Sequence, residues 1–258
     1  MNDRERLDRR LVASGRFSSG ERARHAIRAG WVRIDDRPVL KPGIKVAPDA
    51  IISCTVPLEH YVGRGGAKLA AALDEFSITV TGAVALDVGS STGGFTECLL
   101  RRGARRVYCL DVGHGQMHPG LAADPRVIQL EGVNARHVTA DLLPEKATLC
   151  TVDVSFISVR LVLEPVAMLL APGADLVVLV KPQFEVGRGR LGKGGIVRDP
   201  ESIRRAVRDV ISSAASLPFA AVRVYPCPIL GGDGNREVFI HFSGTVTAGA
   251  LDEALVCL

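Results

Sequence analysis

The sequence predicts an α/β protein, in which a small basic α+β module precedes a larger domain with an open, mostly parallel sheet. Three observations lead to this prediction. Strand-like apolar runs alternate with helical patterns from about residue 84 onwards, which is typical of a sheet with helices on both faces. The chain has 258 residues, enough for one sizeable core and a small accessory domain. The net charge of +4 lies entirely within residues 1–60, which hold 12 basic and 8 acidic residues.

The first 60 residues have the pattern of two short helices and a small hairpin. Residues 6–15 place leucines on one helix face and end at a glycine. Ser18 and Glu21 form a capping box for a second helix, which leaves its arginines on the outer face. Residues 31–38 alternate like a strand and its turn, and a last short strand follows at residues 51–52. The excess of positive charge indicates either a module that binds a polyanion or a solvated charged surface.

This module resembles the S4 RNA-binding domain, also called the αL motif. The matching residues are Leu7, Asp8, Leu11, Gly15, Ser19, Arg22, Ala23, Ile27, Gly30, Val32, Ile34, Pro42 and Val46. The resemblance implies that residues 1–60 form a domain that binds RNA through shape and phosphate contacts. The candidate RNA-binding residues in it are Arg6, Arg10, Arg16, Arg22, Arg24 and Arg28.

A second domain is expected over residues 64–258, after a glycine-rich linker at residues 59–68. Its first helix is expected to open at Lys68, an unfavourable place for a cation, so a functional role is weighed against a solvated charge. The expected strands are 84–88, 107–111, 127–130, 149–153, 175–181, 222–225 and 238–242. The expected helices are 95–102, 158–170 and 200–217.

The stretch LDVGSSTGGF, residues 86–95, leads from the first of these strands into a helix. A dinucleotide and S-adenosylmethionine are both ligands for such a turn. The turn lacks the middle glycine of G-x-G-x-x-G, and an acidic residue before it suits a cationic amino acid moiety better than a pyrophosphate. Asp111 ends the next strand, where it can accept the ribose hydroxyls, and Asn134 can border the adenine. S-adenosylmethionine is therefore favoured, with candidate residues Asp87, Gly89, Ser90, Ser91, Thr92, Gly93, Gly94, Phe95, Asp111 and Asn134.

Charged residues stand at strand ends where a core strand would simply stop. Asp153 and Lys181 each close a predicted parallel strand. Glu237 opens the last strand, which a preceding hairpin turns antiparallel, so it begins at the same edge of the sheet. Together with Lys68 from the first helix, they form a set of four candidate catalytic residues.

This set resembles the K-D-K-E tetrad of FtsJ-like RNA 2′-O-methyltransferases. With RGGAKL, LDVGSSTGGFT, DVSFIS and VKPQFE in the same chain, the whole sequence resembles the TlyA family. Members combine an S4 domain with a Rossmann-like methyltransferase domain, and they are ribosomal RNA cytidine 2′-O-methyltransferases that were long labelled haemolysins. The resemblance implies S-adenosylmethionine as cofactor and ribosomal RNA or ribosomal subunits as partner.

The residue types agree with that chemistry, because transfer to a ribose 2′-hydroxyl needs an oxygen that is deprotonated and aligned with the methyl group. We expect Lys181 to act as the base or to stabilise the developing alkoxide, with Asp153 and Glu237 orienting the two lysines. The basic, glycine-rich loop at residues 187–195 is expected to meet RNA phosphates through Arg188, Arg190 and Lys193, or else to be merely solvated.

Other function classes find less support in the sequence. No apolar run approaches the length of a membrane span, and the N-terminal residues do not resemble a signal peptide, which predicts a cytoplasmic protein without a membrane partner. The six cysteines form no C-x-x-C pair, and His114 and His118 have no evident third ligand, so no metal is expected. The rival functions are a noncatalytic RNA-binding or assembly factor, a membrane-lytic haemolysin, and a small-molecule methyltransferase.

Overall fold

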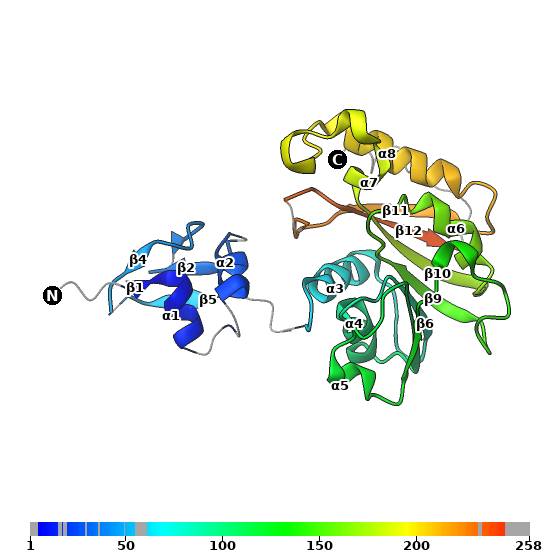
Figure 1. Cartoon of the computed structure of the whole chain (residues 1–258), viewed down its shortest axis with the longest axis horizontal. Coiled ribbons are helices and arrows are strands. Elements are labelled where there is room, and N and C mark those ends of the chain that lie inside the picture. Colours follow the sequence, from blue (N-terminus) through cyan, green and yellow to red (C-terminus); the bar gives the residue numbers. More distant parts are fainter. Residues whose placement is uncertain are drawn as a thin grey trace. The chain divides into compact units, whose positions relative to one another are not determined.

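The computed structural model describes residues 5–14, 17, 20–28, 30–35, 37–48, 50–54, 61–231 and 234–245 (Figure 1). The chain forms two compact units, residues 1–60 and residues 61–258, each with its own apolar core.

In the first unit, two helices pack against short antiparallel strands. The helices are α1 (Leu7–Ala13) and α2 (Gly20–Arg28). Strand β2 (Val32–Ile34) pairs with both β3 (Arg37–Pro38) and β5 (Ile52–Cys54), while β1 (Glu5–Arg6) pairs with β4 (Lys45–Val46). The expected hairpin is thus part of a larger set of strands, because segments far apart in sequence pair across the unit. The leucine face of the first helix is buried as predicted, and the core consists of Leu7, Leu11, Phe17, Ala23, Ala26, Ile27, Val32 and Val46. Ser18 of the predicted capping box lies outside the described residues.

The second unit is built on a seven-stranded sheet with the order β11-β12-β10-β9-β6-β7-β8. Its parallel strands are β6 (Val84–Val88), β7 (Arg106–Asp111), β8 (Val127–Glu131), β9 (Ala147–Val152) and β10 (Leu170–Val180). Strand β12 (Val238–Ser243) runs antiparallel to β10 and to β11 (Ala220–Pro226). The predicted α/β architecture is therefore confirmed, including the reversed last strand.

Helices cover both faces of this sheet (Figure 1). One face carries α3 (Arg64–Phe76) and α4 (Gly94–Arg101), and the other carries α6 (Arg160–Ala167) and α8 (Pro200–Ser213). Shorter helical turns are α5 (Pro119–Ala122), η1 (Ala135–His137), α7 (Pro182–Glu185), η2 (Arg188–Arg190) and η3 (Lys193–Gly195). The strands at the centre of the sheet are covered from both sides, which explains why they read as continuous apolar runs.

Two boundaries differ from the prediction for physical reasons. Helix α3 begins at Arg64, so Lys68 is its fifth residue and does not open it. The glycines before Lys68, which indicated a linker, belong to the first turn of this helix. Strand β10 begins at Leu170, earlier than expected, with an irregular register up to Asp175 where Gly173 adopts a left-handed conformation with φ 76°.

Candidate active site

The charged residues predicted at strand ends gather at one edge of the sheet. Strands β12, β10 and β9 are neighbours in the sheet. Val180 pairs with Val238 at the end of the β10–β12 ladder, so Lys181 and Glu237 flank the last pair. Asp153 follows β9 directly, and its amide donates to the carbonyl of Val88 in β6 at 2.9 Å. The edge therefore carries two carboxylates and one lysine from three adjacent strands.

Lys181 lies against Asp153 and Ser155. Its Nζ is 2.6 Å from Asp153 Oδ1, and it donates a hydrogen bond to Ser155 Oγ at 2.6 Å. The contact with Asp153 is an ion pair without hydrogen-bond geometry. The side chains of Lys181 and Asp153 are 13% and 22% exposed, so this pair is open to solvent on one side.

Lys68 forms a second ion pair, with Glu237. The ammonium nitrogen donates to Glu237 Oε2 at 2.5 Å, and the two side chains are only 9% and 3% exposed. Gly231 lies beneath this carboxylate, since a Cβ on it would come within 2.5 Å of Glu237 Oε1. The structure thus brings the four predicted catalytic residues together as two lysine–carboxylate pairs.

The glycines of the VGRGGAKL stretch bring Lys68 to this edge. A Cβ on Gly66 would come within 2.2 Å of the Tyr61 ring, and one on Gly65 within 3.0 Å of the Phe95 ring. A Cβ on Gly65 would also lie 4.0 Å from Asp153 Oδ2, so the first turn of α3 runs beside that carboxylate. The predicted glycine-rich linker at residues 59–68 is therefore wrong from residue 64 onwards, because Gly65 and Gly66 permit close packing of α3.

The glycine-rich turn joins β6 to α4 at the point where the strand order reverses. Its residues Gly89, Ser91 and Gly93 have φ angles of 85°, 46° and 94°. A Cβ on Gly89 would come within 2.3 Å of the carbonyl oxygen of Asp153, so only glycine lets β6 and β9 end side by side. Most amides of this turn are used within the protein. Those of Gly89 and Ser90 donate to the carbonyl of Leu110, and that of Gly93 donates to the carbonyl of Ser90. Of the other predicted residues of the turn, Thr92 is exposed, whereas Ser90, Gly94 and Phe95 are buried.

Asp111 borders this turn from the end of β7. Its two carboxylate oxygens accept the amides of Ser91 and Gly113, both at 2.8 Å. A carboxylate has about four lone-pair sites, so two sites remain for a ligand. Val112 beside it is 69% exposed, and Asn134, also exposed, caps η1 by accepting the amide of Arg136 at 3.0 Å.

Asp87 lies inside the sheet and does not reach the surface of the turn. Its side chain is completely buried, and its oxygens accept the hydroxyls of Thr96 at 2.6 Å and Thr151 at 3.1 Å. Burial raises the pKa of Asp87 from its ordinary 3.8 to about 7, against these two hydrogen bonds, which lower it. The expectation of a direct contact with the cofactor is corrected accordingly. Asp87 ties the first turn of α4 to β9 from below.

Two buried residues that the sequence prediction did not single out support the site. Glu185, in the VKPQFE stretch, accepts the hydroxyl of Ser158 at 2.5 Å and the amide of Val159 at 2.8 Å. Asn235 is 1% exposed and holds Val197 and Gly195 to the hairpin before Glu237. The only sequence feature that could have pointed to Glu185 and Asn235 is a polar residue close to a predicted strand end, because their hydrogen-bond partners are distant in sequence.

Two of the predicted RNA-binding residues of the first unit, Arg6 and Arg10, have partners within the unit. Arg6 is bound by both carboxylate oxygens of the buried Asp8, at 3.0 and 2.8 Å. Arg10 donates to the backbone carbonyls of Ala47 and Pro48. Both arginines thus have partners within the unit, while Arg6 keeps 47% of its side chain exposed, and their role in RNA binding stays a prediction.

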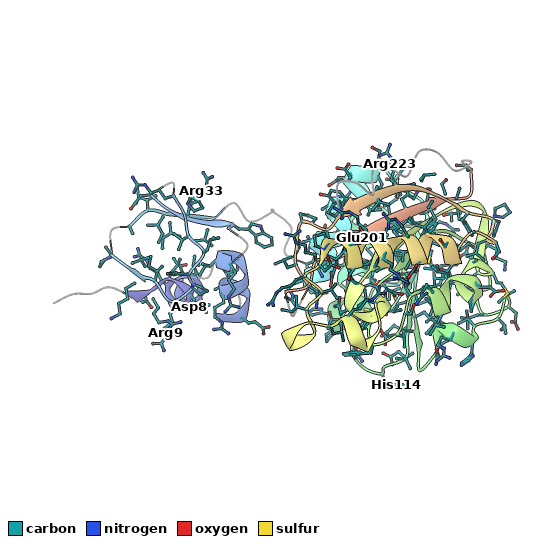
Figure 2. All side chains as sticks on the ribbon, turned by 90° about the horizontal axis from the view of Figure 1, so that it is seen from above. Asp8, Arg9, Arg33, His114, Glu201 and Arg223 are labelled. Atoms are coloured by element: carbon teal, nitrogen blue, oxygen red, sulfur yellow. The ribbon has the colours of Figure 1, made fainter. Side chains whose placement is uncertain are left out.

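Arg24 and Arg28 are exposed, as are Arg9 and Arg33, which the prediction had left out. Arg9 and Arg33 project from opposite sides of the unit, while Asp8 points inward (Figure 2). In the loop after β10, Arg190 is exposed. Arg16 and the side chains of Arg22, Arg188 and Lys193 lie outside the described part of the chain.

Other sequence expectations concern cysteines, metals and membranes. Cys98, Cys109, Cys150 and Cys227 are all buried. Within the described residues, no group of three or more histidine, cysteine, aspartate or glutamate side chains could hold a metal ion. No helix in the described ranges has the length and apolar character needed to cross a membrane.

Comparisons with known proteins match both units. The model of the FtsJ-like methyltransferase family matches residues 61–243, and the S4 domain model matches residues 5–52. The 16S/23S rRNA (cytidine-2′-O)-methyltransferase TlyA of Mycobacterium tuberculosis is 43% identical over 241 residues, 93% of this chain and 90% of the relative.

Solved structures of known proteins also resemble this chain. A Streptococcus thermophilus protein provisionally named a hemolysin is 34% identical and has a TM-score of 0.74, with 100% of this chain and 96% of that chain covered. A Listeria monocytogenes protein provisionally named an S-adenosylmethionine-dependent methyltransferase has a TM-score of 0.52 at 13% identity, covering 69% of this chain and 98% of that one. The last likeness shows the fold alone.

Proposed function

Because the chain belongs to the FtsJ-like methyltransferases and, within them, to the TlyA family, we propose that it methylates the 2′-hydroxyl of cytidine in ribosomal RNA, with S-adenosylmethionine as donor. The observation that carries this proposal is the pair of lysine–carboxylate contacts, Lys181–Asp153 and Lys68–Glu237, at the sheet edge beside the glycine turn. Two lysines paired in this way suit a reaction that removes a proton from a weak acid and places charge on an oxygen.

The residues around the glycine turn fit the proposed cofactor. The free lone pairs of Asp111 suit its ribose hydroxyls. The exposed side chain of Val112 offers an apolar surface for the adenine, with Asn134 at its border. When bound, S-adenosylmethionine supplies a methyl group on a cationic sulfur.

Lys181 is the residue that we assign to the 2′-hydroxyl. Its side chain is 13% exposed against 9% for Lys68, and its partner Asp153 is 22% exposed against 3% for Glu237, so this pair is the one open to an RNA ribose. Lys181 takes the proton of the hydroxyl or stabilises the negative charge that develops on the oxygen. Asp153 holds the ammonium in place, while the buried Lys68–Glu237 pair fixes the floor of the site and adds a second positive charge.

RNA binding is assigned to the S4 domain together with the loop after β10. Arg24, Arg28 and Arg190 are exposed members of the predicted set. Contacts of these arginines with phosphates provide affinity and position, and the tetrad edge provides the chemistry. Because the substrate is ribosomal RNA, we also place the protein in the cytoplasm.

The decisive experiment maps ribose methylation of ribosomal RNA in cells with and without the gene, and after its replacement by a Lys181→Ala copy. We expect specific cytidine 2′-O-methyl marks only with the unaltered chain. Methyl marks that persist in the Lys181→Ala strain would show that Lys181 is not needed for methyl transfer. An absence of marks with the unaltered chain, despite RNA binding, would favour the rival function of a noncatalytic assembly factor.

The RNA-binding assignment has its own experiment. We expect Arg24→Ala with Arg28→Ala to weaken RNA binding and to lower the salt slope by about one for each lost phosphate contact. Binding of S-adenosylmethionine, measured by calorimetry, should stay unchanged, whereas Asp111→Ala should weaken the cofactor and not the RNA. If the double arginine variant kept both affinity and slope, this face of α2 would be only a solvated surface.

A further inference from the structure

The hydroxyl of Ser155 occupies a defined place on the ammonium group of Lys181. Lys181 Nζ donates to Ser155 Oγ at 2.6 Å and lies 2.6 Å from Asp153 Oδ1. Ser155 is exposed, whereas Lys181 is largely covered. The serine therefore lies on the side of the ammonium from which a ribose must approach.

A count of donors shows what this contact leaves free. A lysine ammonium has three N–H groups. One N–H is given to Ser155, and the ion pair with Asp153 covers a second side of the ammonium without hydrogen-bond geometry, so N–H groups remain for a substrate oxygen. The Ser155 hydroxyl accepts from Lys181, so its own proton points elsewhere, and among the described residues no acceptor for it is found. This O–H is a second donor for the substrate.

The backbone around Ser155 is held in an uncommon conformation. Phe156 has a φ of 66°, in the left-handed region, although its side chain is 88% exposed and gains little from burial. Hydrogen bonds fix the segment on both sides of the serine. Before it, the amide of Asp153 donates to the carbonyl of Val88, and after it, the amide of Val159 donates to the carboxylate of Glu185. Between these two anchors the chain must reverse, and the reversal turns Ser155 toward Lys181.

We propose that Ser155 is a positioning residue for the methyl transfer, one that fixes the Lys181 ammonium so that one N–H points at the ribose 2′-oxygen. This inference rests on the proposed function. Lysine has a long flexible side chain, and Asp153 alone leaves the ammonium free to rotate about one contact. The serine adds a hydrogen bond, which limits this rotation and sets the directions of the other N–H groups.

The first experiment measures single-turnover methyl transfer with saturating cofactor and RNA. We expect Ser155→Ala to lower the rate by about 10- to 100-fold, as for loss of a hydrogen bond to a charged group, with affinities for RNA and S-adenosylmethionine within about twofold. Ser155→Thr, which keeps the hydroxyl, should restore most of the rate. Ser213→Ala, which removes a serine hydroxyl bound to the Val210 carbonyl in α8, is the matched control and should behave as the unaltered chain. Combined with Lys181→Ala, the Ser155 change should have little further effect.

A second experiment does not depend on activity. The side-chain ammonium signal of Lys181 in ¹H–¹⁵N spectra, assigned by its loss in Lys181→Arg, should be slowed in exchange by its two partners. Ser155→Ala should weaken or broaden this signal, while that of Lys68, which has no contact with Ser155, stays unchanged.

The outcomes separate this inference from the proposed function. An active chain whose Ser155→Ala variant keeps its rate, or loses RNA affinity in proportion, overturns the positioning role. A failure of threonine to restore the rate also overturns it. If the unaltered chain transfers no methyl group to RNA, the proposed function fails and the role fails with it, while the ammonium signal still reports whether the contact exists.

Discussion

The two lysine–carboxylate pairs have the same chemistry and lie at the same sheet edge, yet they differ in burial. Lys68 and Glu237 are almost completely covered, while Lys181 and Asp153 keep one side open and share a serine. A buried pair is held together, because each charge alone would face a large desolvation penalty. An open pair can accept a substrate oxygen as a further partner. The difference in burial therefore makes Lys68–Glu237 the structural pair and Lys181–Asp153 the pair that is available for the reaction.

Asp87 is a third carboxylate close to this edge, and it has no lysine. Two hydroxyls bind it, and its pKa is raised to about 7, with burial as the largest cause. For Asp87, burial outweighs the two hydrogen bonds, and its pKa rises. Each of the following changes tests one part of this comparison.

The largest effect is expected at the open pair. Lys181→Ala should lower the single-turnover rate of methyl transfer by about 10²- to 10⁴-fold, the usual contribution of an acid–base group. RNA affinity and the unfolding transition should stay nearly unchanged, because the side chain ends in a partly open site. Lys181→Arg should not restore the rate, since a guanidinium stays protonated and has a planar shape. A Lys181→Ala variant with most of its rate would contradict the division into fixed and reactive pairs.

The buried pair should affect stability instead. Lys68→Met leaves Glu237 covered without its cation, which should cost about 3–5 kcal/mol of unfolding free energy. The double variant Lys68→Met, Glu237→Gln removes both charges and should regain much of that loss. Urea unfolding followed by circular dichroism measures all three proteins. Equal stability of the single and double variants would show that the pair is not coupled as its burial implies.

Asp87 should make stability depend on pH. The folded protein holds a proton on this carboxyl between pH 4 and 7 and the unfolded chain does not, so the unfolding free energy should fall as pH rises through this range. Between pH 5 and pH 8 the expected fall is roughly 2–3 kcal/mol, and it should level off above the folded pKa. Asp87→Asn removes the titrating group, so the difference between the two stability curves isolates it. Parallel curves would mean that Asp87 is ionised throughout.

The smallest change in stability is expected for Asp153. Asp153→Asn should alter the unfolding free energy by only about 1 kcal/mol or less, as is usual for an ion pair with a solvent-facing side. Its rate of methyl transfer should nevertheless fall by about tenfold, because the ammonium of Lys181 loses its ionic partner. The same measurements on Glu237→Gln should show a larger loss of unfolding free energy than Asp153→Asn shows. Similar stability losses for both variants would remove the distinction between the pairs.

The sequence alone predicted the fold class and the four charged residues of the candidate catalytic site, Lys68, Asp153, Lys181 and Glu237. The β-α-β rhythm follows from short apolar runs that alternate with helical periodicity, and the glycine turn and the charges at strand ends are visible at their positions in a single sequence. The edge at which Asp153, Lys181 and Glu237 meet followed from topology, because parallel strands end on one side and a hairpin returns the last strand to it.

Only the tertiary structure decided which charges pair and how deeply each is buried. Lys68 and Glu237 are 169 positions apart in the chain, and no local pattern links them. The sequence of Gly65 and Gly66 suggested a linker. Their role is to let the helix pack against the rings of Phe95 and Tyr61, and these contacts are known only from the structure. Likewise, the sequence predicted a cofactor contact for Asp87, but the structure buries its side chain beneath the turn. The sequence also predicted an RNA contact for Arg10, and the structure shows that its guanidinium donates to two backbone carbonyls. Burial and partner choice depend on contacts between distant segments, and those are set by packing, not by sequence spacing.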